Sequence, residues 1–194
     1  EKTLIYGYNH EEYNRNLKLI SYGSCTVNAF LPFAQWIDEN YGIVDSDVNV
    51  IHNIQEYRLK DNYTLNRKFC TLEKSAQLLM DSINDENFHV NYTVIPYTGV
   101  SMIDYRFRVE SGLSLEEFLS DFEHDILDGE LKGLYGLSEK DTGPEIHNCT
   151  PFSSVFIKEN IAIKNGNIYL PAYFDNENSV NRYYDLVDFI SQKK

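Results

Sequence analysis

A cysteine stands where a helix is expected to begin, and this position could make it a nucleophile. The positive end of a helix dipole lowers the pKa of a thiol, and Cys25 directly precedes the apolar helical pattern of residues 26–41. His147 and Asn165 follow downstream, and this order of thiol, imidazole and amide is typical of one class of cysteine hydrolase. Residues 16–24 contain no Gln for an oxyanion hole, however, and Asn165 begins an Asn-Gly turn. We therefore interpret Cys25 as a buried structural cysteine.

His124 and Asp128 form a second candidate pair, in a His-x-x-x-Asp-Gly stretch that ends at Gly129. A histidine in such a pair can act as a general base. The pair falls on a predicted amphipathic helix that Ser114 begins. At 100° per residue, His124 lies about 180° and Asp128 about 220° from the apolar Leu115. Both side chains should face water, so we interpret them as a surface pair and not as catalytic residues.

The spacing of the other candidate ligands does not indicate a metal or phosphate site. His10, His52 and His89 lack the His-x-x-x-His and His-Glu-x-x-His patterns of zinc sites, and the sequence has no Gly-rich phosphate loop. The three cysteines form no Cys-x-x-Cys pair, and an odd number suits a disulfide framework poorly. We expect no metal site and a reducing compartment, the cytoplasm.

Composition and charge exclude several classes of partner. The chain has 194 residues, 42% of them hydrophobic and 24% charged, which is typical of a globular protein. Its formal net charge of -13 should repel nucleic acid and anionic lipid. No apolar run approaches the roughly 20 residues of a membrane span, and no signal peptide is recognised at Glu1. We therefore expect no nucleic acid or membrane partner.

The hydrophobic pattern predicts one α/β domain over residues 1–194, with alternating strands and helices. Strands are predicted at 3–8, 48–51, 90–96 and 103–109, and Asn165-Gly166 should form the turn of a hairpin between 161–164 and 168–170. Helices are predicted at 10–19, 26–41, 72–83, 114–127 and 180–190. The last helix carries its apolar side chains on one face, and we expect that face to pack on the rest of the domain: Val180, Tyr183, Tyr184 and Val187.

Several short stretches occur in an order that resembles one known lobe. They are Gly23-Ser24-Cys25-Thr26 before the long apolar helix, Asp45-Ser46-Asp47-Val48-Asn49-Val50, Val90-Asn91-Tyr92-Thr93-Val94-Ile95-Pro96, and Ser114-Leu115-Glu116-Glu117-Phe118-Leu119. The order is similar to that of the C-terminal lobe of nonribosomal peptide synthetase condensation domains, in the chloramphenicol acetyltransferase-like superfamily. Cys149-Thr150-Pro151-Phe152-Ser153-Ser154 also resembles the Cys-x-Pro-Trp-x-Ser stretch of the related acetyltransferases.

This resemblance implies a chloramphenicol acetyltransferase-like half-fold, a mixed sheet with helices packed on it. It implies part of a condensation domain, an acyltransferase that forms amide bonds between carrier-bound groups. The superfamily's own His-His-x-x-x-Asp-Gly motif belongs to the other lobe, so the chain alone should be inactive. Ser154 would stabilise an oxyanion, with Phe152 packed beneath it on the same strand face. The substrate channel would include five residues: Asn91, Pro96, Pro151, Phe152 and Ser154.

The implied partners are the missing N-terminal lobe and acyl or peptidyl carrier proteins. No cofactor would bind directly, and the phosphopantetheine arm of the carrier would enter as substrate. Two alternatives remain. One is a stand-alone noncatalytic module that docks a carrier or partner protein, and the other is a papain-like cysteine hydrolase that uses Cys25.

Overall fold

The computed structural model describes residues 1–61, 64–110 and 112–193, and its centre is a mixed β-sheet. Among these residues the sheet has eight strands in the order β4-β5-β3-β6-β10-β8-β7, with β9 paired to β10 outside that path. Two pairs are parallel, β3 with β5 and β7 with β8, and the other pairs are antiparallel. The predicted α/β class with a mixed sheet is therefore confirmed. The strands of this sheet are β3 (Ile43–His52), β4 (Asn66–Arg67), β5 (Phe88–Val94), β6 (Ser101–Val109), β7 (Tyr135–Ser138), β8 (Ser154–Ile157), β9 (Ala162–Lys164) and β10 (Asn167–Phe174).

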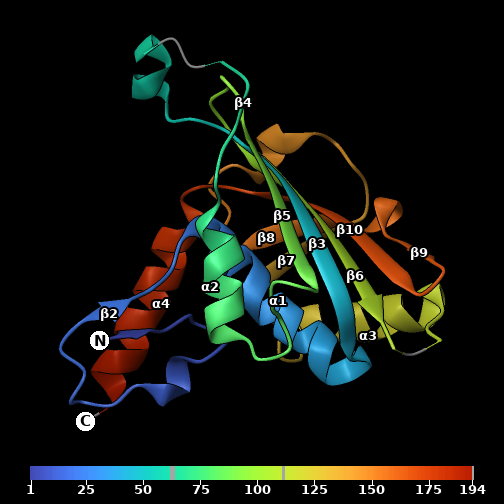
Figure 1. Cartoon of the computed structure of the whole chain (residues 1–194), viewed down its shortest axis with the longest axis horizontal. Helices are drawn as coiled ribbons and strands as arrows, with labels where there is room; N and C mark the ends of the chain where they lie inside the picture. The colour runs from blue at the N-terminus through green and yellow to red at the C-terminus, as the bar shows by residue number, and fades with distance from the viewer. Residues whose placement is uncertain (62–63, 111, 194) are drawn as a thin grey trace.

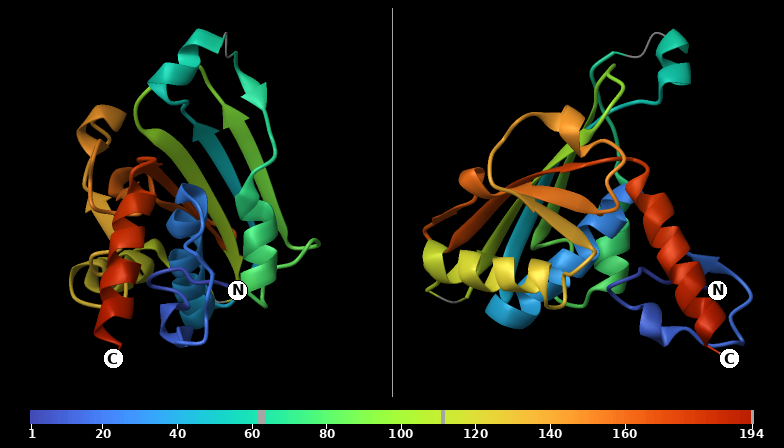
Figure 2. Two further views of the ribbon diagram at one scale, coloured as in Figure 1. Left: turned by 90° about the vertical axis from the view of Figure 1, so that its left-hand side faces the viewer. Right: turned by 180° about the vertical axis from the view of Figure 1, so that it is seen from behind.

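The α-helices pack around the longest of them, α1 (Cys25–Tyr41), which lies across the sheet (Figure 1). α1 contacts both α2 (Thr71–Leu79) and α4 (Asn178–Gln192), while α3 (Leu115–Leu127) packs beside β7. A separate pair of short parallel strands, β1 (Lys2–Thr3) and β2 (Ile20–Ser21), precedes α1. The two ends of the chain lie on the same side of the molecule (Figure 2), where Lys193 Nζ is 2.8 Å from a Glu11 carboxylate oxygen.

α1 begins and ends where its sequence predicts. The Ser24 hydroxyl accepts the backbone N–H of Val27, which satisfies one of the free donors at the start of the helix. Gly42 ends the helix with φ +68°, a conformation that glycine adopts without a Cβ clash. Residues 26–34 are buried without interruption, so the first half of α1 is enclosed on all sides, by the sheet and by the neighbouring helices.

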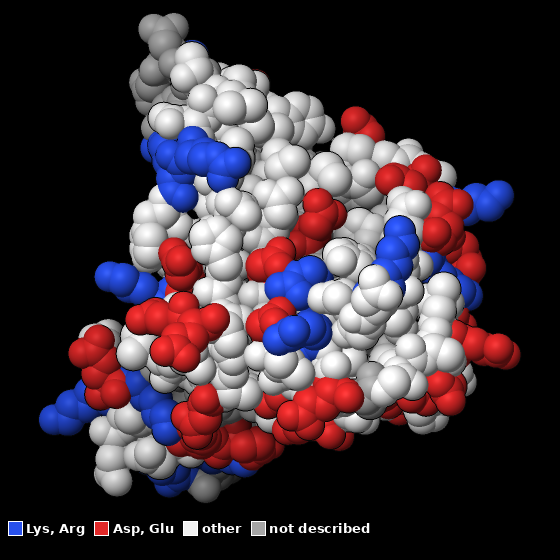
Figure 3. Space-filling view, turned by 45° about the vertical axis from the view of Figure 1, so that its right-hand side comes forward, with Lys and Arg blue, Asp and Glu red and all other residues white. Residues whose placement is uncertain are grey.

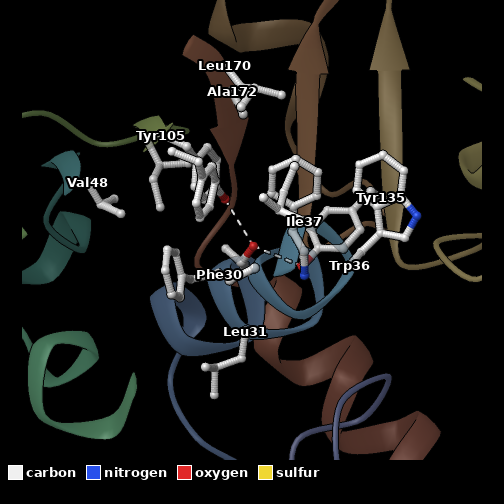
Figure 4. Packing of buried hydrophobic residues seen from close by; sticks show 14 of the residues in the cluster. Phe30, Leu31, Trp36, Ile37, Val48, Tyr105, Tyr135, Leu170 and Ala172 are labelled. Atoms are coloured by element: carbon white, nitrogen blue, oxygen red, sulfur yellow. Dashed lines mark hydrogen bonds between the residues drawn. The ribbon is translucent and has the colours of Figure 1, made fainter. Parts of the chain in front are cut away.

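Pro32 interrupts the hydrogen-bond ladder inside α1, and a tyrosine from the sheet fills the interruption. The Tyr135 hydroxyl accepts the N–H of Phe33 at 3.0 Å and donates to the carbonyl of Ala29 at 2.9 Å. Tyr105 also donates to the Ala29 carbonyl, at 3.0 Å. Figure 4 shows both tyrosines pointing from the sheet toward α1 among the packed side chains. The helix therefore tolerates an internal proline because side chains of β6 and β7 satisfy its free backbone groups.

Most of the predicted elements are confirmed, including the Asn165-Gly166 turn, in which φ is 52° and 75°. The capping box of α3 is also present: Glu117 N–H donates to Ser114 Oγ, and Ser114 N–H donates to the Glu117 carboxylate. Two elements are wrong. The predicted helix at 10–19 is a single 3-10 turn at His10–Glu12, and the strand predicted at 3–8 ends at Thr3. β7 was not predicted, because it is only four residues long and shows no alternation of burial. The strand expected through Phe152 and Ser154 begins only at Ser154, as β8.

α4 presents a different face to the core from the one its pattern predicts. The apolar residues expected inside are 44–70% exposed: Val180, Tyr183, Tyr184 and Val187. The buried residues are instead Asn178, Arg182 and Leu186. Arg182 is only 4% exposed because its guanidinium donates to two backbone carbonyls, those of Gly133 and Pro151. α4 thus carries an exposed apolar face.

On the face shown in Figure 3, acidic side chains gather over the lower half and the right-hand edge, with lysines and arginines in small groups among them. One such group lies on the solvent side of β3 and β6, where Arg106 and Arg108 each pair with Asp45 at 2.7 Å. Arg106 also pairs with Asp47. Within the residues that the structure describes, none of the helices has the length and apolar character of a membrane span.

Candidate active site

A thiol and an imidazole meet where α1 begins and β3 ends. Cys25 is the first residue of α1, and His52 is the last residue of β3. Cys25 Sγ lies 3.4 Å from His52 Nε2, which is hydrogen-bond distance for sulfur. The two residues are 27 positions apart, and the packing of α1 on the sheet brings them together. This is the geometry of a nucleophile beside its base.

The second ring nitrogen of His52 fixes the proton arrangement of the pair. Nδ1 lies 2.7 Å from the backbone carbonyl of Asn53, and a carbonyl can only accept a hydrogen bond. The proton of the neutral ring is therefore on Nδ1, which leaves the lone pair of Nε2 facing the thiol. The ring lies between two aromatic side chains, with centroids 5.5 Å from both Tyr92 and Phe174. His52 is thus held in the orientation and the tautomer that a base needs.

Burial sets the resting charges of the pair. It raises the pKa of the Cys25 thiol to about 12, although the backbone N–H of Thr26 at the start of α1 opposes the shift. Burial also lowers the pKa of His52, partly offset by the hydrogen bond to Asn53. Both groups are therefore neutral at pH 7, and the thiolate forms only when His52 takes the proton.

The pair opens into a cavity of about 350 Å³. Aromatic and aliphatic side chains form much of the wall, and two basic residues, Arg58 and Lys68, also line it. A cavity with an apolar wall, convergent polar groups and a reactive pair is the usual form of a small-molecule site. The lining residues are Cys25, His52, Asn53, Ile54, Gln55, Arg58, Lys68, Phe69, Tyr92, Val94 and Asn176.

Asn176 places an unused acceptor at the same cavity. It lies between β10 and α4, and its Nδ2 donates to Asn53 Oδ1 at 2.6 Å. Its other side-chain atom, Oδ1, is buried and has no protein partner. A buried carbonyl oxygen without a donor is unfavourable, so this atom suits a ligand that brings an N–H group.

The structure does not assemble the hydrolase constellation of Cys25, His147 and Asn165. His147 is stacked on Tyr173 with ring centroids 5.2 Å apart, and Asn165 forms the hairpin turn. Cys25 is only partly buried and lines a cavity, which differs from the structural role that we expected. Its partner, His52, is the last residue of a strand in the sheet. That position was the available signal, because sites in α/β proteins gather at strand ends.

The residues predicted for a substrate channel lie apart from this pair, and none of the five lines the Cys25 cavity. Ser154 is completely buried and lies 3.3 Å from the Tyr105 hydroxyl. Phe152 precedes β8, so strand alternation does not place it under Ser154; it packs on Gly136, where a Cβ would lie 2.8 Å from the ring. Asn91 accepts a hydrogen bond from Arg67 at 2.8 Å.

The other channel residues and the surface pair also lie outside the cavity. Pro96 is exposed after β5, and the carbonyl of Pro151 accepts from Arg182 at 2.9 Å. His124 and Asp128 are exposed at the end of α3, and Asp128 pairs with Lys132 at 2.7 Å. In the described part of the chain, no group of three or more His, Cys, Asp or Glu residues could hold a metal ion.

Comparison with known proteins identifies relatives of a different class from the one the short stretches suggested. No family model matches the chain. The chain is 25% identical over 207 aligned positions to glyceraldehyde-3-phosphate dehydrogenase 1 of Bacillus cereus, covering 98% of the chain and 61% of that protein. It is 26% identical to the cytosolic glyceraldehyde-3-phosphate dehydrogenase of Dianthus caryophyllus, covering 96% and 59%. The muscle glyceraldehyde-3-phosphate dehydrogenase of Jaculus orientalis is 25% identical, with 98% and 56% covered. The chain thus spans about 60% of the length of these curated relatives.

These relatives overturn the resemblance to a condensation domain. The expected amide-bond formation, the carrier-protein docking module and the papain-like hydrolase are wrong. The expectations that no cofactor binds directly and that a phosphopantetheine arm enters as substrate are also wrong. The relatives are dehydrogenases, and a dehydrogenase passes hydride to a cofactor. The error has a physical origin. Each matched stretch is a short strand or helix start that many α/β folds share, and none contains a reacting group with its partner.

Proposed function

We propose that this chain is the thiol-bearing part of a nicotinamide-dependent aldehyde dehydrogenase of the glyceraldehyde-3-phosphate dehydrogenase type. One observation carries the proposal: the Cys25 thiol faces the free lone pair of His52 Nε2 at 3.4 Å, inside a cavity. The similarity of nearly the whole chain to named dehydrogenases supports it. A thiol beside a base can hold an aldehyde covalently while the aldehyde carbon is oxidised.

The residues of the pair have defined tasks in such a reaction. Cys25 Sγ attacks the aldehyde carbon, and the thiol proton passes to His52 Nε2. The aldehyde oxygen then takes that proton, which gives a hemithioacetal on Cys25. As the carbon is oxidised to a thioester, Nε2 takes the hydroxyl proton. Cys25 lies at the start of α1, where the positive end of the helix dipole favours negative charge on the oxygen during the attack.

Asn176 fits a nicotinamide cofactor. The ring's carboxamide carries N–H donors, and the buried Oδ1 of Asn176 is an acceptor without a partner on the wall of the Cys25 cavity. Asn176 would hold the carboxamide, and Tyr92 would supply an apolar wall. When bound, the nicotinamide ring supplies the acceptor for the hydride.

Two further features support the proposal that a separate structural unit binds the dinucleotide part of the cofactor. The sequence has no Gly-rich phosphate loop, and the chain corresponds to about 60% of its relatives' length. α4 begins two residues after Asn176 and exposes Tyr183, which packs on Tyr22 with ring centroids 4.9 Å apart. We propose that a dinucleotide-binding unit packs over this apolar face.

The basic residues of the cavity favour an anionic aldehyde. Arg58 and Lys68 line the cavity that contains Cys25, on a chain whose net charge is -13. The relatives are named for an aldehyde that carries a phosphate. A guanidinium and an ammonium group are common phosphate ligands, so we propose a phosphorylated aldehyde as the substrate.

Acylation of the thiol tests this assignment without the cofactor. With acetyl phosphate, Cys25 should attack the acetyl carbon and phosphate should leave, giving an acetyl thioester that mass spectrometry locates and hydroxylamine removes. Cys25→Ser should abolish this adduct, and Cys149→Ser, at an exposed cysteine outside the cavity, should retain it. Acetylation spread over Cys149 and surface lysines, with Cys25 unmodified, would contradict the proposal.

The remaining expectations from the sequence have no direct bearing on this chemistry. A cytoplasmic location is proposed, in agreement with the name of the cytosolic relative from Dianthus caryophyllus. The chloramphenicol acetyltransferase-like half-fold, the arrangement in one domain and the absence of nucleic acid and membrane partners stay predictions.

A further inference from the structure

One buried residue contacts both the base and the unused acceptor of the cavity. Asn53 directly follows β3 and is 6% exposed. Its backbone carbonyl lies 2.7 Å from His52 Nδ1, and its side-chain Oδ1 accepts Asn176 Nδ2 at 2.6 Å. The orientation of the imidazole and that of the amide therefore depend on the same residue.

The backbone at this residue is anchored to the sheet and to a neighbouring loop. The Asn53 N–H donates to the Ser101 hydroxyl at 3.1 Å, and Ser101, the first residue of β6, is 1% exposed. The next N–H, that of Ile54, donates to the carbonyl of Tyr97 at 2.9 Å. With both N–H groups bonded, the Asn53 carbonyl that accepts the hydrogen bond from His52 Nδ1–H has a fixed direction.

The side-chain bond determines which atom of Asn176 is available to a ligand. A primary amide can exchange its oxygen and nitrogen by turning about its last torsion angle. Because Nδ2 donates to Asn53 Oδ1, the unpartnered atom is Oδ1, an acceptor. Without this bond, either the oxygen or the nitrogen of the Asn176 amide could face a ligand in the cavity.

We propose that Asn53 is a positioning residue that sets the His52 tautomer through its carbonyl and the Asn176 orientation through its side chain. The role of Asn176 rests on the proposed function, whereas the His52 tautomer does not. A purely structural role for Asn53 makes a different prediction, because every substitution would then lower stability and leave the selectivity of the cavity unchanged.

Two substitutions of Asn53 distinguish a positioning role from a purely structural one. Asn53→Asp keeps an acceptor oxygen in place of Oδ1, and Asn53→Leu has a similar size without one. Asn176→Ala removes the same hydrogen bond from its other side. Asn49→Leu is the matched control, since Asn49 is exposed on the same strand and does not line the cavity.

The experiment measures alkylation of Cys25 by iodoacetamide on the full chain, with free nicotinamide as the competing ligand. Nicotinamide should slow alkylation of the unsubstituted protein and of Asn53→Asp with similar dissociation constants. Asn53→Leu and Asn176→Ala should each weaken nicotinamide binding about tenfold. The double variant should bind nicotinamide no more weakly than either single variant. Asn49→Leu should behave as the unsubstituted protein does.

Nitrogen NMR of His52 provides a readout that is independent of the cofactor. The unsubstituted protein, Asn53→Asp and Asn53→Leu should show one ring form with the proton on Nδ1, because all three keep the backbone carbonyl. Ser101→Ala removes the acceptor of the Asn53 N–H and should show a mixture. Equal protection by nicotinamide in all four variants, or an unchanged tautomer in Ser101→Ala, would overturn the positioning role. If nicotinamide protects none of the proteins while the tautomer changes as expected, the proposed cofactor is wrong and the effect of Asn53 on His52 stands. Thermal unfolding verifies folding, and Asn53→Ala replaces Asn53→Leu if the leucine variant does not fold.

Discussion

Replacement of His52 should strongly reduce the reactivity of Cys25, and the structure sets the size of the effect. Burial raises the pKa of the Cys25 thiol to about 12, so at pH 7 a fraction of about 10⁻⁵ is thiolate without help. An ordinary thiol with a pKa near 8.5 is about 3% thiolate at this pH. Cys25 alone should thus react roughly three thousand times more slowly than an ordinary cysteine. A positioned base typically increases the reaction rate of its nucleophile by about 10²–10⁴-fold. Because His52→Asn removes this base, it should slow alkylation of Cys25 at pH 7 by about a hundredfold or more.

Mass spectrometry of iodoacetamide-treated protein measures this rate for each cysteine separately. Exposed Cys149 is the internal reference and should react at the same rate in both proteins. His89→Asn is the matched variant, because His89 is exposed on β5 and does not line the cavity. A rate at Cys25 within a factor of about three of the unsubstituted protein in His52→Asn would refute the assignment of His52 as its base.

Three further variants test the packing and the surface. Tyr135→Phe should lower the free energy of unfolding in urea by about 1–3 kcal/mol, because Phe33 N–H loses its acceptor, and a change below about 0.5 kcal/mol would contradict this role. Burial lowers the pKa of His147, so this residue contributes stability above its unfolded pKa of about 6.5 that is lost as the pH falls through its folded pKa. His147→Phe should therefore lose less stability than the unsubstituted protein between pH 7.5 and 5.5, and an equal loss in urea titrations would disprove this. The double change Val180→Ser and Tyr184→Ser should reduce hydrophobic dye binding without lowering the unfolding temperature, whereas a large fall in that temperature would show that the face is already packed.

Local signals in the sequence predicted much of the fold. α1 is defined by its N-terminal cap at Ser24, its apolar spacing and Gly42, and the β9–β10 hairpin by Asn165-Gly166. These features depend on a few neighbouring residues. The orientation of α4 could not be predicted in this way. Buried Arg182 pairs with Asp185 on its own helix, but it also needs the carbonyls of Gly133 and Pro151, which lie elsewhere in the chain.

The candidate site was the hardest part to predict, for a related reason. Cys25 was recognised as a thiol at a helix start, but its partner was sought downstream at His147 by analogy of order. The true neighbour is His52, which lies beside Cys25 only because α1 packs across the end of β3. The carbonyl that fixes its tautomer and the oxygen of Asn176 are likewise products of tertiary packing. Residue types and order therefore indicated nucleophilic chemistry but could not identify the base.

The most direct test of the proposed dehydrogenase is a single turnover with glyceraldehyde 3-phosphate and a large excess of NAD⁺, without phosphate as acceptor. With a dinucleotide-binding unit supplied, we expect up to one reduced nicotinamide for each Cys25, an acyl group left on that thiol, and neither product in Cys25→Ser. A protein whose Cys25 is acylated by acetyl phosphate, yet which forms no reduced nicotinamide from the aldehyde even with a dinucleotide-binding unit supplied, would contradict the account.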